Sequence, residues 1–280
     1  MTRFLVVNAD DFGRSRGVSA GIVEAHLHGL VSTTTALMNL PGSGPDVAQA
    51  AREVPSLGLG VHLNLTLGRP LSPPASVSTL ISPAGTFWPP EALAARRPDV
   101  DLDQVKREWH AQVEAFLARG AALDHLDSHH HAAVFAPDWW KIALDLAAEF
   151  GCGVRPPAPV DVQDDILFSR FPETARRFAT SEAGGMISLR GIQTADRLVT
   201  RFYGPAVDLS TLLSIIQDLP HGTTELMCHP GRLDFALASE SGYAREREAE
   251  LAVLTSAQAR SAIQRAGIRL TTYRMMATAS

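Results

Sequence analysis

Residues 5–13 read LVVNADDFG, an apolar run that ends in two adjacent carboxylates and a glycine. Such a run is typical of a buried strand, and the residues after Gly13 predict a turn before the next helix. Successive side chains of a strand point to opposite faces, so Asp10 and Asp11 should diverge. A cation between them, or a proton on one of them, would explain two carboxylates at a buried strand end. The alternative is that Asp10 caps the turn and Asp11 is solvated.

Length and composition favour one large α/β unit. The chain has 280 residues, which suits a barrel of about 250 residues, and we find no linker, so we expect a single catalytic domain over 1–280. A net charge of −5 with scattered basic residues argues against a nucleic-acid surface. Two distant cysteines, Cys152 and Cys228, predict no disulfide framework and a reducing, cytoplasmic location. No segment approaches ~18 consecutive apolar residues, and the opening run is too short for a signal peptide.

Strand and helix patterns alternate along the chain. Strands are predicted at 33–38, 57–66, 123–128, 153–156, 223–229 and 268–271. Helices are predicted at 18–30, 46–53, 102–117, from Pro137 onward, and at 172–180, 194–202, 245–254 and 256–266. Residues 67–100 are proline-rich and predict a functional loop insertion, in which Phe87 and Trp88 either stack on a ligand or anchor the loop.

Histidines and carboxylates concentrate at the ends of the predicted strands. In residues 57–66, His62 belongs to a polar face that an α/β barrel would turn toward its interior or mouth. Residues 124–131 read DHLDSHHH, and alternation puts His125, Asp127 and His129 on one face, with His131 in the following turn. Four histidines and two aspartates in eight residues indicate a metal or acid/base site.

Three more residues could support such a site. Arg155 ends a short strand and either orients a catalytic carboxylate or makes an ordinary ion pair. Glu225 lies on the same face as His229 in the strand at 223–229, and a buried glutamate needs a partner. That partner is either a ligand or Arg155, as a supporting contact, or a core ion pair.

Four strand ends therefore present the two aspartates, His62, His129 and His229. Residues drawn from the C-terminal ends of several strands are typical of a barrel active site. One carboxylate and two imidazoles make a three-ligand metal site with an open position, and the spare carboxylate and histidine are then a base and an acid.

At these motifs the chain resembles a known family. NADDFG at 8–13, GVH at 60–62, HLDSHHH at 125–131 and MCHP at 227–230 are similar to the signature motifs of YdjC-like carbohydrate deacetylases, which include chitooligosaccharide deacetylases. The resemblance runs in the same order from the first strand to Tyr273. It implies a distorted (β/α) TIM-like barrel and hydrolysis of N-acetyl groups on amino sugars or short chitooligosaccharides, with release of acetate.

The resemblance also implies roles for individual residues. Asp11, His62 and His129 become ligands of one divalent metal ion, for which Mg²⁺ and Zn²⁺ are the candidates; Asp10 becomes the general base and His229 the general acid. Family members often carry a further histidine where this chain has Ala133. That difference leaves the ligands untouched but puts the exact substrate in doubt. The family also suggests a homodimer.

Two other functions fit the same residues. One is a metal-dependent hydrolase of another amide or ester bond; a phosphoesterase is disfavoured because the motifs lack a phosphate loop and a basic cluster. The other is a carbohydrate-binding protein without turnover, which would need neither the base nor the acid.

Overall fold

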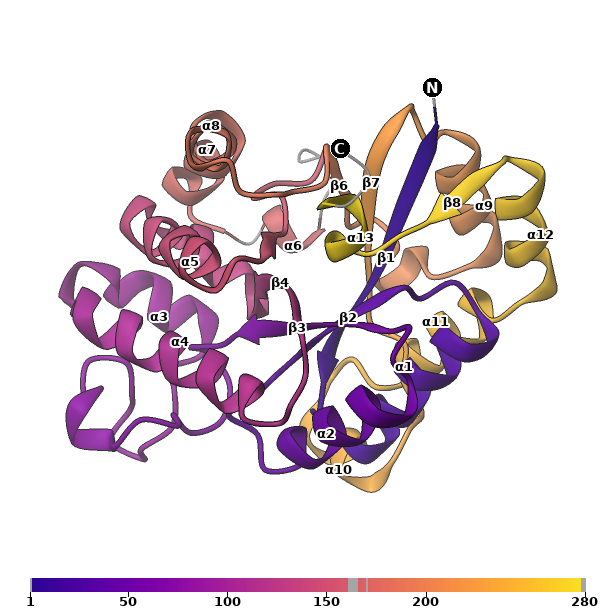
Figure 1. The fold of residues 1–280 in the computed structure, drawn as a ribbon. Helices are drawn as coiled ribbons and strands as arrows, with labels where there is room; N and C mark the ends of the chain where they lie inside the picture. The colour runs from indigo at the N-terminus through magenta and orange to yellow at the C-terminus, as the bar shows by residue number, and fades with distance from the viewer. Residues whose placement is uncertain (1, 161–165, 170, 278–280) are drawn as a thin grey trace.

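The computed structural model describes residues 2–160, 166–169 and 171–277 (Figure 1). Its strands are β1 (Arg3–Phe12), β2 (Thr33–Ala36), β3 (Gly58–Leu63), β4 (Leu123–Ser128), β5 (Gly153–Val154), β6 (Arg197–Val199), β7 (Gly222–Cys228) and β8 (Ile268–Leu270). Its α-helices are α1 (Arg16–His28), α2 (Ser43–Glu53), α3 (Pro90–Arg96), α4 (Leu102–Leu117), α5 (Pro137–Phe150), α6 (Ile166–Ser169), α7 (Glu173–Ser181), α8 (Ala183–Arg190), α9 (Leu209–Gln217), α10 (Phe235–Glu240), α11 (Arg245–Leu254), α12 (Ala257–Arg265) and α13 (Tyr273–Ala277). Short 3₁₀ turns lie at Pro74–Ser76, Arg97–Asp99, His129–Phe135 and Gly204–Ala206.

The strands form one parallel sheet in the order β5-β4-β3-β2-β1-β7-β6, and β8 pairs with the start of β1. The sheet curves so that its edges approach: after β5, the Val160 N–H donates to the Leu198 carbonyl of β6 at 3.0 Å. In the view of Figure 1, helices α3, α4 and α5 lie to the left of the sheet, and α1, α2, α11 and α12 lie below it and to its right. The expected α/β fold with a distorted barrel is confirmed.

Strand β1 is the centre of this sheet. Leu5, Val6 and Val7 are completely buried, because a parallel strand is covered on both faces. The first half of β1 pairs with β7 and β8, and its second half pairs with β2. The buried amide of Asn8 links the strands, accepting from the Thr33 hydroxyl at 2.6 Å and donating to Asp10 at 2.8 Å. Asp10 and Asp11 therefore lie near the C-terminal end of a central strand of the sheet.

Most of the predicted elements are confirmed, with three differences. The helix expected at 194–202 is wrong: this segment contains β6, because its backbone pairs with β7. The strand expected to reach residue 66 ends at Leu63, since the Asn64 side chain accepts from the N–H groups of Thr66 and Leu67 and forms a turn. The insertion at 67–100 is partly helical, as it contains α3.

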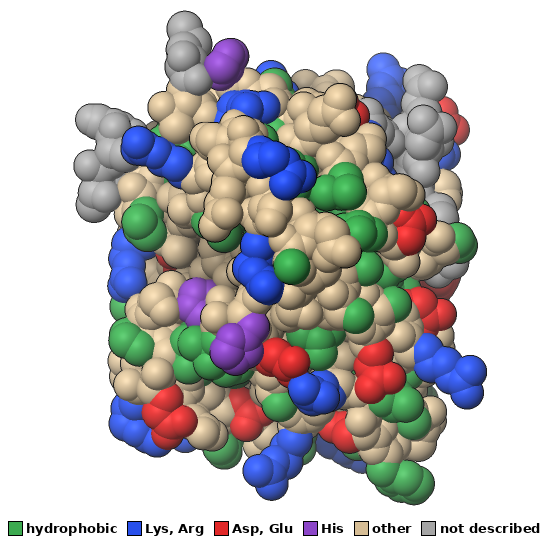
Figure 2. All heavy atoms as spheres, turned by 90° about the vertical axis from the view of Figure 1, so that its right-hand side faces the viewer, with side chains coloured by type: hydrophobic (Ala, Val, Ile, Leu, Met, Phe, Trp, Pro, Cys, Tyr) green, Lys and Arg blue, Asp and Glu red, His purple; other side chains and the backbone are tan. Residues whose placement is uncertain are grey.

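Charged side chains of both signs lie on the surface of the protein (Figure 2). On the face that Figure 2 shows, basic and acidic side chains are interspersed. None of the helices in the described ranges has the length and apolar character that a membrane span requires.

Candidate metal centre and active site

The turn at the end of β1 brings both aspartates to the same place. Asp11 has φ 74°, a left-handed conformation that a non-glycine residue rarely adopts, and Gly13 has φ 82°. An extended Asp11 would point away from Asp10, whereas here both carboxylates lie within 4 Å of His62 Nε2. Strain of this kind is typical of functional sites.

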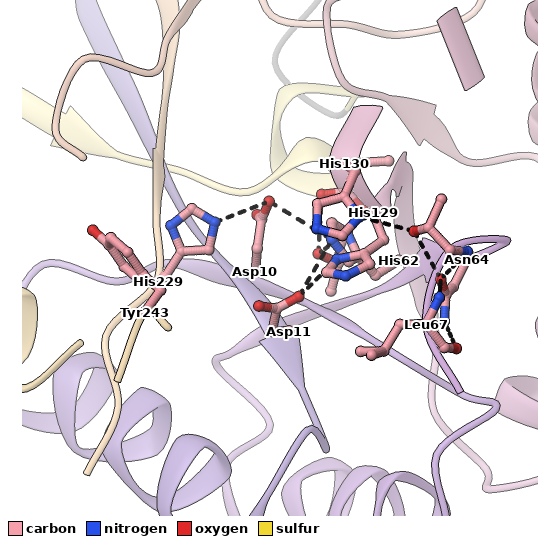
Figure 3. A network of polar contacts seen from close by, with 12 residues as sticks. Asp10, Asp11, His62, Asn64, Leu67, His129, His130, His229 and Tyr243 are labelled. Atoms are coloured by element: carbon pink, nitrogen blue, oxygen red, sulfur yellow. Dashed lines mark hydrogen bonds and ion pairs between the residues drawn. The ribbon is translucent and has the colours of Figure 1, made fainter. Parts of the chain in front are cut away.

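Asp11, His62 and His129 form a buried cluster whose candidate ligand atoms lie within 4.8 Å of one another. Asp11 Oδ1 lies 3.6 Å from His62 Nε2 and 3.1 Å from His129 Nδ1 (Figure 3). Within the described chain, Asp11 Oδ1 makes no hydrogen bond of good geometry and His129 Nε2 has no partner. Buried polar atoms left in this way fit a site that could hold a divalent ion.

Asp10, His62 and Asp127 form a second buried group whose candidate ligand atoms lie within 4.8 Å of one another. Their oxygens, however, are already occupied: Asp127 Oδ1 accepts from His62 Nδ1 at 2.6 Å, and both oxygens of Asp10 accept from Arg155. The bond to Asp127 turns His62 Nε2 toward the cluster, as a carboxylate behind a metal-binding histidine does. The first cluster is therefore the better candidate.

Arg155 connects Asp10 to two other buried carboxylates, those of Glu225 and Asp127. Its Nε donates to Glu225 at 2.7 Å, and its Nη2 lies 3.0 Å from Asp127. Glu225 also accepts from the hydroxyl of Tyr273, which follows β8. The supporting contact expected between Glu225 and Arg155 is present, and it orients a carboxylate at the cluster.

His229 follows β7 on the opposite side of Asp10 (Figure 3). Its Nε2 lies 4.0 Å from Asp10 Oδ2, and its backbone N–H donates to Glu250 of α11. Its ring is edge-on to Tyr203 and Tyr243, which stack on each other with centroids 4.4 Å apart. Glu250 and the two stacked tyrosines thus hold the His229 imidazole beside Asp10.

Burial and neighbouring charges shift the protonation of these groups. Burial works to raise the pKa of Asp11, but Arg247 and His129 outweigh it and hold that pKa well below its usual range. Burial works against the charged form of His62, yet the carboxylates of Asp127 and Asp10 raise its pKa to about 9. Burial lowers the pKa of His229 to about 4, so it is neutral near pH 7.

The cluster opens into a cleft of about 1210 Å³. Its lining includes two aromatic pairs, Phe135 with Phe171 and Tyr203 with Tyr243. A cleft of this size, with aromatic walls and a few polar groups at its base, is typical of a small-molecule site. Phe87 and Trp88 are not among its lining residues: Phe87 is buried in the core, and Arg96 lies over the Trp88 ring.

Two predicted histidines lie apart from the cluster. His125 contacts Asp124 at 3.1 Å and stacks on Tyr273, with ring centroids 4.3 Å apart. His131 faces Phe168 and Phe171 and lines the edge of the cleft. The other predicted site residues contact one another in a continuous network.

Sequence reasoning missed three residues of this site: Arg247, Glu250 and His130. Arg247 donates to Asp11, and Glu250 contacts His229. His130 is exposed, lines the cleft and bonds the Thr66 hydroxyl at 2.9 Å. A signal existed in 245–254, because the buried positions 247, 250, 251 and 254 of α11 form one helix face on which two residues are charged.

Comparison with known proteins gives consistent matches over nearly the whole chain. Residues 4–265 match the model of the YdjC-like protein family. A carbohydrate deacetylase of Geobacillus stearothermophilus is 36% identical over 277 residues, and a chitooligosaccharide deacetylase of Proteus mirabilis is 35% identical over 277 residues, with 98% of each chain covered in both cases. A crystal structure from Enterococcus faecalis, provisionally described as a cellobiose-phosphate cleavage protein, superposes with a TM-score of 0.85, 32% identity and 99% coverage of both chains.

Proposed function

The chain belongs to the YdjC-like family, and on that premise we propose that it is a metal-dependent carbohydrate deacetylase. It would hydrolyse the N-acetyl groups of amino sugars or short chitooligosaccharides and release acetate. The relatives named carbohydrate and chitooligosaccharide deacetylases support the reaction. The observation that carries the proposal is the buried Asp11, His62 and His129 cluster beside a second carboxylate and a second imidazole.

Asp11, His62 and His129 would hold the ion. One oxygen and two nitrogen donors are compatible with Zn²⁺ and with several other divalent ions, and the family resemblance adds Mg²⁺. When bound, the ion would polarise the acetyl carbonyl and lower the pKa of the attacking water. His62 would offer its Nε2 to the ion, because its Nδ1 is held by a hydrogen bond to Asp127.

Asp10 is the proposed base. The Arg155 guanidinium overcomes the effect of burial and keeps the pKa of Asp10 well below its ordinary value, so the carboxylate is charged and ready to accept a proton at neutral pH. The same bidentate contact fixes the carboxylate plane. Its Oδ2 lies 3.9 Å from His62 Nε2 and 4.0 Å from His229 Nε2.

His229 is the proposed acid. Its Nε2 borders the cleft next to Asp10, where it can reach a departing amine. A sugar amine is too basic to leave without a proton, so a donor here lowers the barrier to cleavage of the carbon–nitrogen bond. The aromatic side chains on the cleft walls offer surfaces for the apolar face of a sugar ring. The homodimer and the cytoplasmic location remain predictions.

A substrate panel tests this function against the alternatives. N-acetylglucosamine, chitobiose and chitotriose would be compared with an O-acetylated sugar and a phosphorylated sugar, with acetate and phosphate measured separately. We expect acetate from at least one N-acetyl sugar. Release only from the ester or phosphoester would support another hydrolase, and sugar binding without any product would support a binding protein.

A further inference from the structure

Glu250 is a fully buried glutamate at the back of His229. Its Oε2 accepts from the His229 backbone N–H, and its Oε1 accepts from the Tyr243 hydroxyl at 2.6 Å. The same Oε1 lies 3.8 Å from Nδ1 of the His229 ring. Nδ1 is itself buried and has no hydrogen-bond partner among the described residues.

Glu250 Oε1 and His229 Nδ1 need a proton between them. A carboxylate oxygen and an imidazole lone pair are both acceptors, and a buried acceptor without a donor is costly. One proton on either atom converts the 3.8 Å contact into a hydrogen bond after a small rotation of the ring. Nε2, on the other side of the ring, is 4.0 Å from Asp10 Oδ2 and borders the cleft.

The surroundings indicate where that proton resides. Burial raises the pKa of Glu250 to about 8, against the opposing effects of the His229 N–H, Tyr243 and Arg247. Burial lowers the pKa of His229, with Asp10 opposing this shift and Arg247 adding to it. Near pH 7 the proton is therefore on Glu250, and the neutral imidazole carries its own proton on Nε2, facing the cleft.

We propose that Glu250 is a positioning residue that stores a proton for His229. The inference rests on the proposed deacetylase function. As the carbon–nitrogen bond breaks, Nε2–H passes its proton to the departing amine and Nδ1 takes the proton of Glu250. The products of this step are a neutral free amine, a Glu250 carboxylate and a neutral imidazole protonated on Nδ1.

Asp10 completes the cycle. It holds the proton that it took from the attacking water, and its Oδ2 is the carboxylate oxygen next to His229 Nε2. Return of that proton to Nε2, with Nδ1 giving its proton back to Glu250, restores all three groups. The relay explains how a histidine that is neutral at pH 7 can act as an acid.

Glu250→Gln tests the relay, because glutamine keeps the shape of the side chain, one accepting oxygen and an N–H donor, but has no acidic proton. In the metal-loaded enzyme we expect kcat on the N-acetyl sugar to fall about a hundredfold, with KM within about twofold. Hydrolysis of 4-nitrophenyl acetate, whose leaving group needs no proton, should stay within about twofold. Equal losses on both substrates would show a structural role and overturn the proposal.

Glu108→Gln is the matched control. Glu108 is also fully buried and accepts hydrogen bonds at both oxygens, from the N–H groups of Leu71 and Ser72 and from the Gln112 side-chain amide, but it lies away from His229. We expect its kcat to stay within about twofold of the wild type. A loss equal to that of Glu250→Gln would mean that any buried glutamine is damaging, which would remove the support for a relay.

A spectroscopic readout separates this inference from the function itself. In full-length protein with ¹⁵N-labelled histidine and bound Mg²⁺ or Zn²⁺, the His229 signals are identified by their loss in His229→Asn. We expect the wild type and Glu250→Gln to carry the ring proton on Nε2 at pH 7, and Glu250→Leu to shift toward the other tautomer. A wild-type proton on Nδ1 would overturn the proposal even if the enzyme is a deacetylase. An enzyme without deacetylase activity but with the expected tautomers would overturn the function alone.

Discussion

Arg155 donates to both oxygens of Asp10, at 2.8 and 2.6 Å, from a position 145 residues further along the chain. The contact joins the end of β5 to the end of β1 across the interior of the curved sheet. Arg155 also holds Glu225 of β7. This one guanidinium therefore neutralises carboxylates from two strands and fixes the orientation of the proposed base.

Arg155→Met should destabilise the protein and lower its activity. It leaves the Asp10 and Glu225 carboxylates buried without their cation, which costs about 3 kcal/mol or more. Urea unfolding of the wild type and the variant measures this loss. Arg155→Lys keeps the charge but cannot make the bidentate contact, so we expect it to retain more stability than activity. If Arg155→Met had the same free energy of unfolding as the wild type, that result would contradict a stabilising role for the buried ion-pair network.

Metal affinity should rise with pH. The carboxylates around His62 overcome the effect of burial and raise its pKa from 6.5 to about 9, so the metal-free protein carries a proton that a metal ion must displace. Affinity should then increase roughly tenfold per pH unit between pH 7 and 9, with about one proton released at pH 7, and level off above pH 9.

Calorimetric titrations in buffers of different ionisation enthalpy measure both quantities. Asp127→Asn is the comparison variant, because it removes the carboxylate that raises the His62 pKa most and should flatten the dependence. An affinity that is the same at pH 7 and pH 9 in the wild type would contradict a role for His62 as a ligand.

The two adjacent aspartates should have separable roles. Asp11→Asn should weaken metal binding at least about tenfold, because it removes the charged oxygen donor of the cluster. Asp10→Asn should retain metal binding and lose about a hundredfold or more in kcat, since its oxygens contact Arg155 and its role is that of a base. Calorimetry together with an acetate assay separates them; normal activity in Asp10→Asn would exclude it as the base.

Gly13→Ala should destabilise the turn that presents the aspartates. A Cβ at this position would lie 2.5 Å from the Cα of Ser43, and φ 82° is unfavourable for alanine. We expect a loss of roughly 2 kcal/mol or more in the free energy of unfolding, measured in urea. Gly184→Ala is the control, because its Cβ would meet nothing within 4 Å and alanine favours the helix α8. Similar stabilities for both variants would show that the turn tolerates a side chain.

Much of this arrangement could be predicted from the sequence because its signals are local. The run at 5–13 predicts a buried strand, and DHLDSHHH at 124–131 is too rich in ligands to be explained as ordinary surface. The helix at 102–117 has the predicted bounds, with Asp101 as its N-cap. In each case adjacent residues carry the information, and parallel strands deliver their C-terminal ends to one place.

Other parts could not be predicted because they depend on distant contacts. The segment at 194–202 contains β6 only because β7 lies beside it. Asp11 reaches the cluster through a left-handed φ that simple strand alternation does not predict. Arg247 and Glu250 share one helix face with Leu251 and Leu254, but only the packing of α11 against the site shows that they contact Asp11 and His229.

The most direct measurement is acetate release from short chitooligosaccharides by metal-stripped protein, with each divalent ion added back in turn. We predict no release from the stripped protein and recovery with at least one ion at one equivalent per chain, and no recovery in Asp11→Asn. Full activity in protein shown by elemental analysis to contain no metal, or equal recovery in Asp11→Asn, would contradict a metal-dependent deacetylase centred on Asp11, His62 and His129.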